Sequence, residues 1–324
     1  MNTKPSTTMI RSNTFLLAVC AIASLANAQT LERQVIATAG SSFTVGSLTV
    51  STTLGEPFTA TLSNGNHILT QGFQQGEPVR VKLNIRALLQ GPFNSGTGLM
   101  DDGLRTNGLV PLGEPYTALG FVQVGGGDET INASVLTTTG NDAIVDWIYV
   151  QLRDKNDNTL VLATRCALVQ RDGDVVDVDG TSPVSFAASA DNYYLTVFHR
   201  NHLGVMTLAP VALSSTAAAI DLTNGSVPAY GTEAQADIGG TRTLWCGDVT
   251  NDGLVKYAGA NNDRDPVLAE VGGNVPTAVS NGYLNADVNM DGQVKYAGSN
   301  NDRDRILQVV GGSVPTAVRV EQMP

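Results

Sequence analysis

The sequence predicts a mainly β protein that ends in a small module built from two copies of one loop motif. Three observations lead to this prediction. Apolar and polar residues alternate with the two-residue period of strands in several short segments. Glycine, with 34 of the 324 residues, and other turn-forming residues separate these segments. A stretch near the C-terminus recurs at a constant offset of 39 residues. Because 42% of the residues are hydrophobic and only 15% are charged, we expect packed domains.

The N-terminus has the pattern of a secretory signal peptide. Lys4 and Arg11 precede an apolar stretch, 15–25, and an Ala-Asn-Ala triplet that ends at Ala28 fits a cleavage site. The apolar stretch is too short to cross a bilayer, and we find no other candidate for a transmembrane segment. We therefore expect residues 1–28 to be a signal peptide. Cleavage near Ala28 would leave a protein that is secreted or held at the cell surface.

A small β region is expected over residues 29–76. Residues 48–52 alternate apolar and polar side chains, as a half-buried strand does. Asn64-Gly65 favours a tight hairpin, because a type I′ turn needs positive φ at both central positions. Residues 67–73 supply the returning strand, so the sequence predicts a small β-meander.

Residues 79–230 are predicted to form a central antiparallel β-sandwich. Residues 79–87 alternate apolar and polar side chains throughout. Further strand-like stretches follow between turns rich in Gly, Asn and Asp, namely 144–152, 160–169 and 193–198. Residues 91–115 carry few strand signals, so this stretch is either a surface excursion or a binding loop. Residues 231–243 are polar and glycine-rich, as a linker is.

The doubled unit fills residues 244–318, and each copy begins with an EF-hand-like loop. Such a loop places oxygen ligands at positions 1, 3 and 5, turns sharply at a glycine in position 6 and uses a main-chain carbonyl at position 7. Gly253 and Gly292 occupy position 6. The candidate calcium ligands are Asp248, Thr250, Asp252 and Leu254 in the first copy, and Asp287, Asn289, Asp291 and Gln293 in the second.

The acid that closes each loop comes later than in an EF-hand. Position 12, which carries a bidentate acid in an EF-hand, is a glycine in both copies. The next acids are Asp263 and Asp302, and we expect them to close lengthened loops; Asp265 and Asp304 are the alternatives. A helix should follow, with Asp265 as its N-cap and Pro266 in its first position. Acids clustered twice in this way would repel without a cation, which indicates two bound Ca²⁺ ions.

The doubled unit resembles the dockerin-type calcium repeat. The resemblance lies in the Asp-x-Thr/Asn-x-Asp-Gly start of each loop and in the apolar run that follows it. It implies a C-terminal α-helical module, in which two loop-helix segments pack with pseudo-two-fold symmetry, and a role in protein docking. The glycine at position 12 and the longer loop depart from that family's pattern.

Most of the chain after the signal peptide also resembles secreted surface proteins of the Bacteroidota that are described as hemagglutinin-like. The residues that carry this resemblance are Leu54-Gly55-Glu56-Pro57, residues 63–73, residues 114–121, and the Val-Lys-Tyr-Ala-Gly segments at 255–259 and 294–298. The resemblance implies adhesion at the cell surface.

Charge and motif content exclude several functions. The formal net charge is −11 and there is no basic run, so nucleic acid is a poor partner and a hard cation a natural one. No nucleophile elbow, zinc-protease motif or phosphate-binding glycine loop occurs, so we expect no enzymatic role. The acids in 172–179 form either a third cation site or a solvated loop, and 199–202 should be a polar loop. Cys166 and Cys246 are either a disulfide or two buried thiols.

These observations favour a secreted or cell-surface, calcium-binding, non-enzymatic protein. We expect an adhesion or interaction module that two Ca²⁺ ions stabilise and that contacts a surface protein or a glycan. Two alternatives remain: a carbohydrate-binding accessory protein of a polysaccharide-degrading system, and a protein-docking module that acts through the repeat helices. Of the two tryptophans, Trp147 lies in a predicted strand, where a core position is commoner than a sugar platform.

Overall fold

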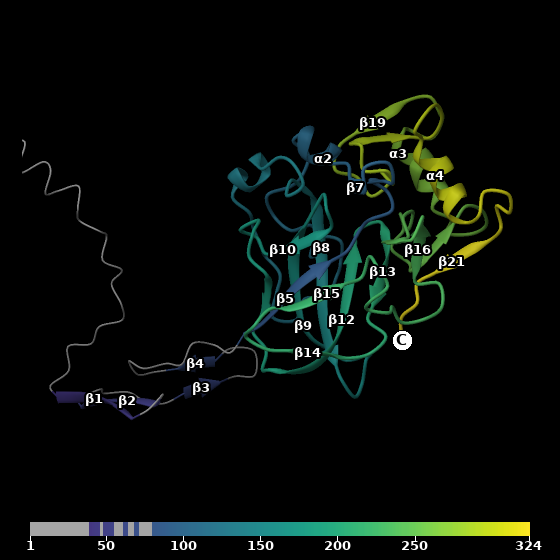
Figure 1. Cartoon of the computed structure of the whole chain (residues 1–324). Coiled ribbons are helices and arrows are strands. Elements are labelled where there is room, and N and C mark those ends of the chain that lie inside the picture. Colours follow the sequence, from purple (N-terminus) through teal and green to yellow (C-terminus); the bar gives the residue numbers. More distant parts are fainter. Residues whose placement is uncertain (1–38, 46–47, 55–60, 64–67, 71–79) are drawn as a thin grey trace, which may run out of the picture. The chain divides into compact units, whose positions relative to one another are not determined.

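The computed structural model describes residues 39–45, 48–54, 61–63, 68–70 and 80–324 (Figure 1). The chain divides into two compact units, 1–77 and 78–324, and each is described by itself. The predicted signal peptide and the Asn64-Gly65 turn lie outside the described residues.

In the first unit the described strands pair as two antiparallel hairpins. β1 (Ala39–Val45) pairs with β2 (Leu48–Leu54), and β3 (Thr61–Ser63) pairs with β4 (Ile68–Thr70). The strand predicted over 48–52 therefore lies inside β2.

The second unit is built on a sheet of nine strands. Its order is β11-β5-β10-β9-β8-β12-β13, with β14 paired to β12 and β15 paired to β5. All of these pairs are antiparallel except β15 with β5. The mainly antiparallel pairing predicted for this region is thus confirmed, and its strands are joined by hydrogen bonds into one sheet, whereas the arrangement as a sandwich stays a prediction. The strands are β5 (Val81–Arg86), β8 (Ile144–Asp154), β9 (Val161–Gln170), β10 (Asp174–Val176), β11 (Val184–Phe186), β12 (Asp191–His199), β13 (His202–Met206), β14 (Val211–Leu213) and β15 (Ala218–Asp221).

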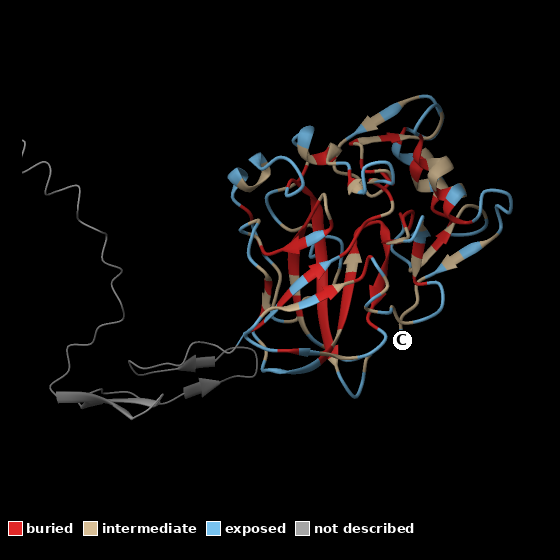
Figure 2. Ribbon diagram, in the orientation of Figure 1, coloured by how far each residue is buried: buried red, intermediate tan, exposed pale blue. Residues whose placement is uncertain are grey.

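The core of this unit lies on the long central strands, as Figure 2 shows. β5 buries every second residue, as its alternating sequence predicts. Trp147 on β8 is fully buried, and its indole N–H donates to the Pro111 carbonyl at 2.8 Å. The Tyr116 hydroxyl donates to the Trp147 carbonyl at 2.9 Å, so the tryptophan is a core residue whose polar atoms are satisfied.

The stretch 91–115 and the predicted linker both carry structure of their own. The first holds the short hairpin β6 (Phe93–Asn94) and β7 (Leu99–Met100), followed by α2 (Gly103–Thr106). A 3₁₀ turn, η1, follows at Ala133–Thr137. Residues 231–243 take part in a second hairpin, β16 (Gln235–Ile238) with β17 (Thr241–Leu244). The Leu244 N–H donates to the Leu88 carbonyl at 2.8 Å, which ties that hairpin to the sheet.

The doubled unit is not the α-helical dockerin-like module that we predicted. The structure is 35% strand and 10% helix, and the described residues hold three short α-helices. In the doubled unit, α3 (Arg264–Glu270) has seven residues and α4 (Asp302–Val309) has eight. Each helix stops after about two turns because the glycine pair that follows adopts positive φ, which ends a helix.

The predicted helix start is also wrong in detail. Helix α3 begins at Arg264, so Asp265 is not its N-cap and Pro266 is not its first residue. In α4 the cap is Asn301, whose side chain accepts from the Asp304 N–H.

The two copies of the doubled unit are joined by exchanged strands. β18 (Leu254–Lys256) of the first copy pairs with β21 (Val318–Val320), which follows the helix of the second. β20 (Gln293–Lys295) of the second copy pairs with β19 (Val279–Asn281), which follows the helix of the first. Val255, Val267, Val294 and Ile306 from both copies share one buried core. Neither copy is therefore a separate folding unit.

A buried polar cluster fastens the doubled unit to the large sheet. The predicted polar loop 199–202 is instead almost fully buried, at 0–2% exposure. The Arg200 side chain donates through Nε to Asp146 at 3.0 Å and through Nη1 to the Leu284 carbonyl. The Tyr283 hydroxyl donates to the same Asp146 at 2.7 Å. Burying these charges is tolerated because Arg200 and Asp146 pair with each other within the large sheet, and each also makes a hydrogen bond to the doubled unit.

Candidate metal centre

Each loop of the doubled unit is folded around the aspartate in its first position. In the first copy Asp248 is 4% exposed, and its two carboxylate oxygens accept the main-chain N–H groups of Asp252, at 3.1 Å, and Gly253, at 3.0 Å. The turn between them needs left-handed backbone, with φ of 54° at Asn251 and 76° at Gly253. The glycine at position 6 is thus explained by the turn it makes.

Asp263, the predicted closing acid, reaches back into the start of the same loop. It is fully buried, and Oδ1 accepts the N–H groups of Val249 at 2.9 Å and Thr250 at 3.1 Å, together with the Thr250 hydroxyl at 3.2 Å. Its Oδ2 accepts the Lys256 N–H at 2.8 Å. The carboxylate therefore links the loop start, strand β18 and the first residues of α3.

The second copy repeats this arrangement. Asp287 accepts the N–H groups of Asp291 at 3.1 Å and Gly292 at 2.8 Å. Asp302 accepts from Val288 at 2.7 Å, and from the N–H groups at positions 289 and 295. The two loops are therefore the same structure built twice, as their sequences predicted.

The ligands predicted at positions 3, 5 and 7 lie at the rim of each loop. Asp252 and Asp291 each accept the N–H two residues on, that of Leu254 and of Gln293, and each lies 3.3 Å from a lysine ammonium. Asn289 accepts the Asp291 N–H at 2.9 Å and donates to the Asn300 carbonyl at 2.9 Å.

The alternative closing acids, Asp265 and Asp304, have a different setting. Their side chains are 59% and 45% exposed and pair with the arginine that precedes each of them. Each also accepts a hydrogen bond at 2.8 Å from an asparagine three residues earlier, Asn262 or Asn301. These two acids therefore hold the helix starts.

Sequence reasoning missed Asn262 and Asn301, which are 5% and 7% exposed. Asn262 accepts the Asp265 N–H at 2.9 Å and donates to the Gly259 carbonyl at 2.8 Å, so it caps the helix and closes the lengthened loop at once. The signal was the Asn-x-x-Asp spacing in both copies, which resembles a capping box.

The ionised forms of the four buried aspartates, Asp248, Asp263, Asp287 and Asp302, are disfavoured, which raises their pKa values. Burial, and then the neighbouring charge of Asp263, raise the pKa of Asp248 to about 7. Burial raises the pKa of Asp263 to about 6, although its N–H donors act in the opposite direction. Asp287 and Asp302 repeat this pattern, with pKa values of about 7 and about 6. None of the four forms an ion pair with a described residue, so each copy holds two buried acids without a bound cationic side chain.

The donor set suits a hard cation, although the acids do not converge tightly. Within the described ranges, no three side chains of His, Cys, Asp or Glu lie together as a metal-binding group. A calcium loop, however, takes many of its six to eight oxygen ligands from main-chain carbonyls, amide or hydroxyl side chains and water. An ionised carboxylate has about four acceptor sites, so the two N–H bonds to Asp248 leave it capacity for a cation.

The acids of 172–179 are bound by protein groups, and the two cysteines do not form a disulfide with each other. Asp177 pairs with Arg165, and Asp179 accepts from the segment 181–182. Asp177 is thus engaged by a residue of strand β9, and Asp172 and Asp179 accept from main-chain N–H groups of their own loop. Cys166 and Cys246 are both buried and are free thiols.

Among the residues that the structure describes, no helix is long and apolar enough to cross a membrane. Comparison of the chain with protein-family models, with curated proteins and with solved structures finds no match.

Proposed function

We propose that this chain is a secreted or cell-surface, non-enzymatic protein that binds two Ca²⁺ ions in its doubled unit and serves as an adhesion or interaction module. The observation that carries the proposal is the pair of buried aspartates, Asp248 with Asp263, which recurs as Asp287 with Asp302. A like-charged pair removed from water and lacking a cation is costly, and a bound divalent ion removes that cost.

Calcium fits this setting better than a softer metal. The candidate donors are carboxylate, amide, hydroxyl and carbonyl oxygens, which Ca²⁺ prefers, and no cysteine or histidine stands in either loop. Asp248 and Asp252 would hold the ion in the first copy, with Asp287 and Asp291 in the second, while Asp263 and Asp302, which each already accept from three main-chain N–H groups, add negative charge beside it. Bound calcium neutralises charge where each loop meets its helix.

The role of the ions is structural in this proposal. Each strand pair of the doubled unit joins one strand from each copy, so an ion that orders one loop also stabilises a strand pair that includes the other copy. Binding to the folded state alone stabilises it by about 2.7 kcal/mol per site when free calcium is 100 times the dissociation constant. Such stabilisation suits a protein exported to a calcium-rich exterior.

A second candidate, carbohydrate binding, is favoured by one observation. A polar cavity of about 710 Å³ lies between the stretch 91–103 and the second loop. Docking through the helices has less support, because Val267, Ile306 and Val309 are already buried inside the doubled unit.

Thermal melting with and without calcium tests the proposal. Two sites at saturation would contribute about 5 kcal/mol, which for a unit of this size raises the melting temperature by roughly 10–20 °C over that in chelator. Asp252→Ala combined with Asp291→Ala should remove most of this difference. Asp157→Ala, which changes an exposed turn acid outside the doubled unit, is the matched control and should keep it. Equal melting curves with calcium and with chelator would contradict the proposal.

A further inference from the structure

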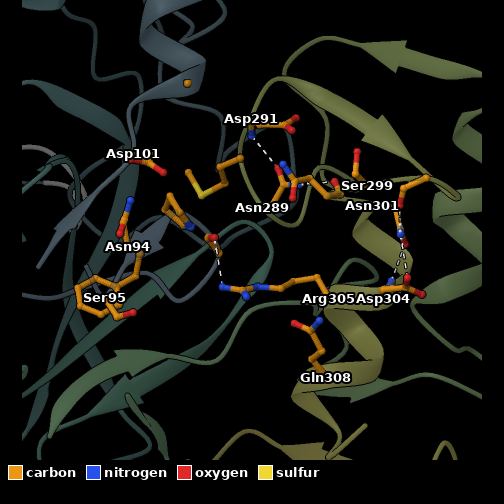
Figure 3. A pocket seen from close by; sticks show the side chains of 17 residues that line it. Asn94, Ser95, Asp101, Asn289, Asp291, Ser299, Asn301, Asp304, Arg305 and Gln308 are labelled. Atoms are coloured by element: carbon orange, nitrogen blue, oxygen red, sulfur yellow. Dashed lines mark hydrogen bonds between the residues drawn. The ribbon is translucent and has the colours of Figure 1, made fainter. Parts of the chain in front are cut away.

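The second loop, unlike the first, forms one wall of a cavity that is open to solvent on one side and has a second wall from another part of the chain. The opposite wall is the stretch 91–103, which leaves the large sheet after β5 and crosses to the doubled unit (Figure 3). In Figure 3, Asn94 and Asp101 stand on one side, Asn289 and Ser299 on the other, and Gln308 on helix α4 below. The volume, about 710 Å³, lies within the roughly 300–1,000 Å³ typical of ligand sites.

The two walls are held together by specific contacts. Arg305 of α4 donates through Nη2 to the Gln90 carbonyl at 2.6 Å, and Asn107 donates to the Asp291 carbonyl at 3.1 Å. A Cβ at Gly91 would lie 2.2 Å from the Val288 carbonyl oxygen, so only glycine permits this approach. The cavity is therefore a built feature of the unit.

Comparison of the two copies shows where the second has diverged. Eight of the 24 aligned positions differ between 248–271 and 287–310. Five of these eight second-copy residues line the cavity: Asn289, Met290, Ser299, Arg305 and Gln308. At the last three of these positions the first copy has Ala260, Pro266 and Ala269, which lack side-chain hydrogen-bonding groups. Polar replacements are thus concentrated on the face of the second copy that lines the cavity.

The corresponding face of the first copy is the internal reference. Its hollow is lined by residues of that copy alone, between Thr250 and Pro266, with no second wall from the large sheet. The second copy therefore differs from the first mainly where it faces the wall 91–103. The shared loop fold does not require these differences, because the first copy has the same fold without them.

The lining has the chemistry of a sugar site. Within the described part of the chain, the side chains of Ser95, Asp101, Ser299, Asn300 and Gln308 are exposed and make no hydrogen bond to another residue. Hydroxyl, amide and carboxylate groups of this kind bind pairs of sugar hydroxyls through complementary donors and acceptors.

The charge of the lining selects among polar ligands. Of the three acids in the lining, Asp291 pairs with Lys295 and Asp304 with Arg303, while Asp101 forms no ion pair with a described residue. The arginine of the lining, Arg305, already donates to the main chain. A phosphate, sulfate or uronate would therefore find no free cationic group there, whereas an uncharged ligand needs none. The half-buried ring of Phe93 adds an apolar surface to the same wall.

We propose that this cavity binds a neutral oligosaccharide, recognised by Ser95, Asp101, Ser299, Asn300 and Gln308 at the junction of the large sheet with the second loop. The proposal rests on the proposed function, because it names the ligand of a module that calcium stabilises. It separates the two loops by role: the first is structural, and the second is structural and also lines a binding site.

The test uses the calcium-loaded full-length protein and a defined panel of probes. The panel holds neutral trisaccharides of glucose, mannose, galactose and xylose, with trigalacturonate as the anionic member. Saturation-transfer NMR identifies binders at about 10 mM, a concentration that detects millimolar affinity, and calorimetry measures the strongest. We expect at least one neutral trisaccharide to bind and trigalacturonate to bind more weakly or not at all.

The variant pair follows from the two copies. Ser299→Ala with Gln308→Ala installs residues that the first copy already tolerates, and should weaken sugar binding about tenfold or more through two lost hydrogen bonds. Ala260→Ser with Ala269→Gln makes the reverse change on the first copy and should leave affinity unchanged.

Three results would overturn the inference: no neutral trisaccharide binds, trigalacturonate binds best, or the Ser299/Gln308 variant keeps wild-type affinity. A calcium titration of the same samples separates the two proposals. Two calcium sites without sugar binding would overturn the sugar site alone, whereas sugar binding without calcium binding would overturn the proposed function alone.

Discussion

Replacing Asp263 by alanine tests whether the buried acid holds the first loop together. The substitution removes the acceptor of three main-chain N–H groups, those of Val249, Thr250 and Lys256, which lie 2.8–3.1 Å from the carboxylate. Each buried donor left without an acceptor costs about 1–3 kcal/mol. Because water can enter the space left behind, we take the lower end and expect a loss of about 3 kcal/mol in the free energy of unfolding.

The assay is urea denaturation in chelator, so that calcium plays no part in the difference between variants. Asp302→Ala should cost a similar amount, because Asp302 accepts the equivalent three N–H groups. Asp265→Ala is the control, since that side chain is 59% exposed and its surface ion pair is worth less than about 1 kcal/mol. Equal losses for Asp263→Ala and Asp265→Ala would refute the role assigned to the buried acid.

Three further predictions concern the junction and the thiols. Burial lowers the pKa of His199, and of His202 well below its usual value, so the folded state resists protons that the unfolded chain takes up below pH 6.5. The contribution of these two histidines to stability should therefore fall from pH 7 to pH 5, whereas Asp248, Asp263, Asp287 and Asp302, whose pKa values are raised, favour the folded state over the same range. His202→Gln should remove about 2 kcal/mol of the histidine contribution, measured as the difference from wild type in urea titrations at pH 7 and pH 5. Gly91→Ala should lower stability by about 1–3 kcal/mol and abolish sugar binding while both calcium sites persist by calorimetry. Cys166 and Cys246 should react with a thiol reagent only in denaturant, and a melting temperature that falls with reductant would contradict their being free.

The features that could be predicted from sequence are those encoded by residues close together in the chain. The alternation over 79–87 matches strand β5, and the repeated Asp-x-x-x-Asp-Gly matches two loops with the same hydrogen bonds. The buried position of Trp147 also follows from its place in a strand. In each case the residues that form the sequence pattern are the same neighbouring residues that form the structural feature.

The features that were missed depend on contacts between residues that are distant in the sequence. The exchange of β19 and β21 between copies, and the cavity under 91–103, need contacts that no local pattern records. Residues 199–202 read as a polar loop because their partners, Asp146 and Leu284, are far along the chain. The helical module was overpredicted because the resemblance implied packing between helices, whereas the two copies are joined by strand pairs that involve residues distant in the sequence.

Calorimetric titration of Ca²⁺ into the chelator-stripped protein measures directly whether the doubled unit binds calcium. We predict a stoichiometry of two, which falls to one in Asp252→Ala and in Asp291→Ala separately, since each residue belongs to one loop. Asp157→Ala should retain both sites. An absence of binding heat, or a stoichiometry that neither loop variant alters, would contradict calcium binding by the doubled unit.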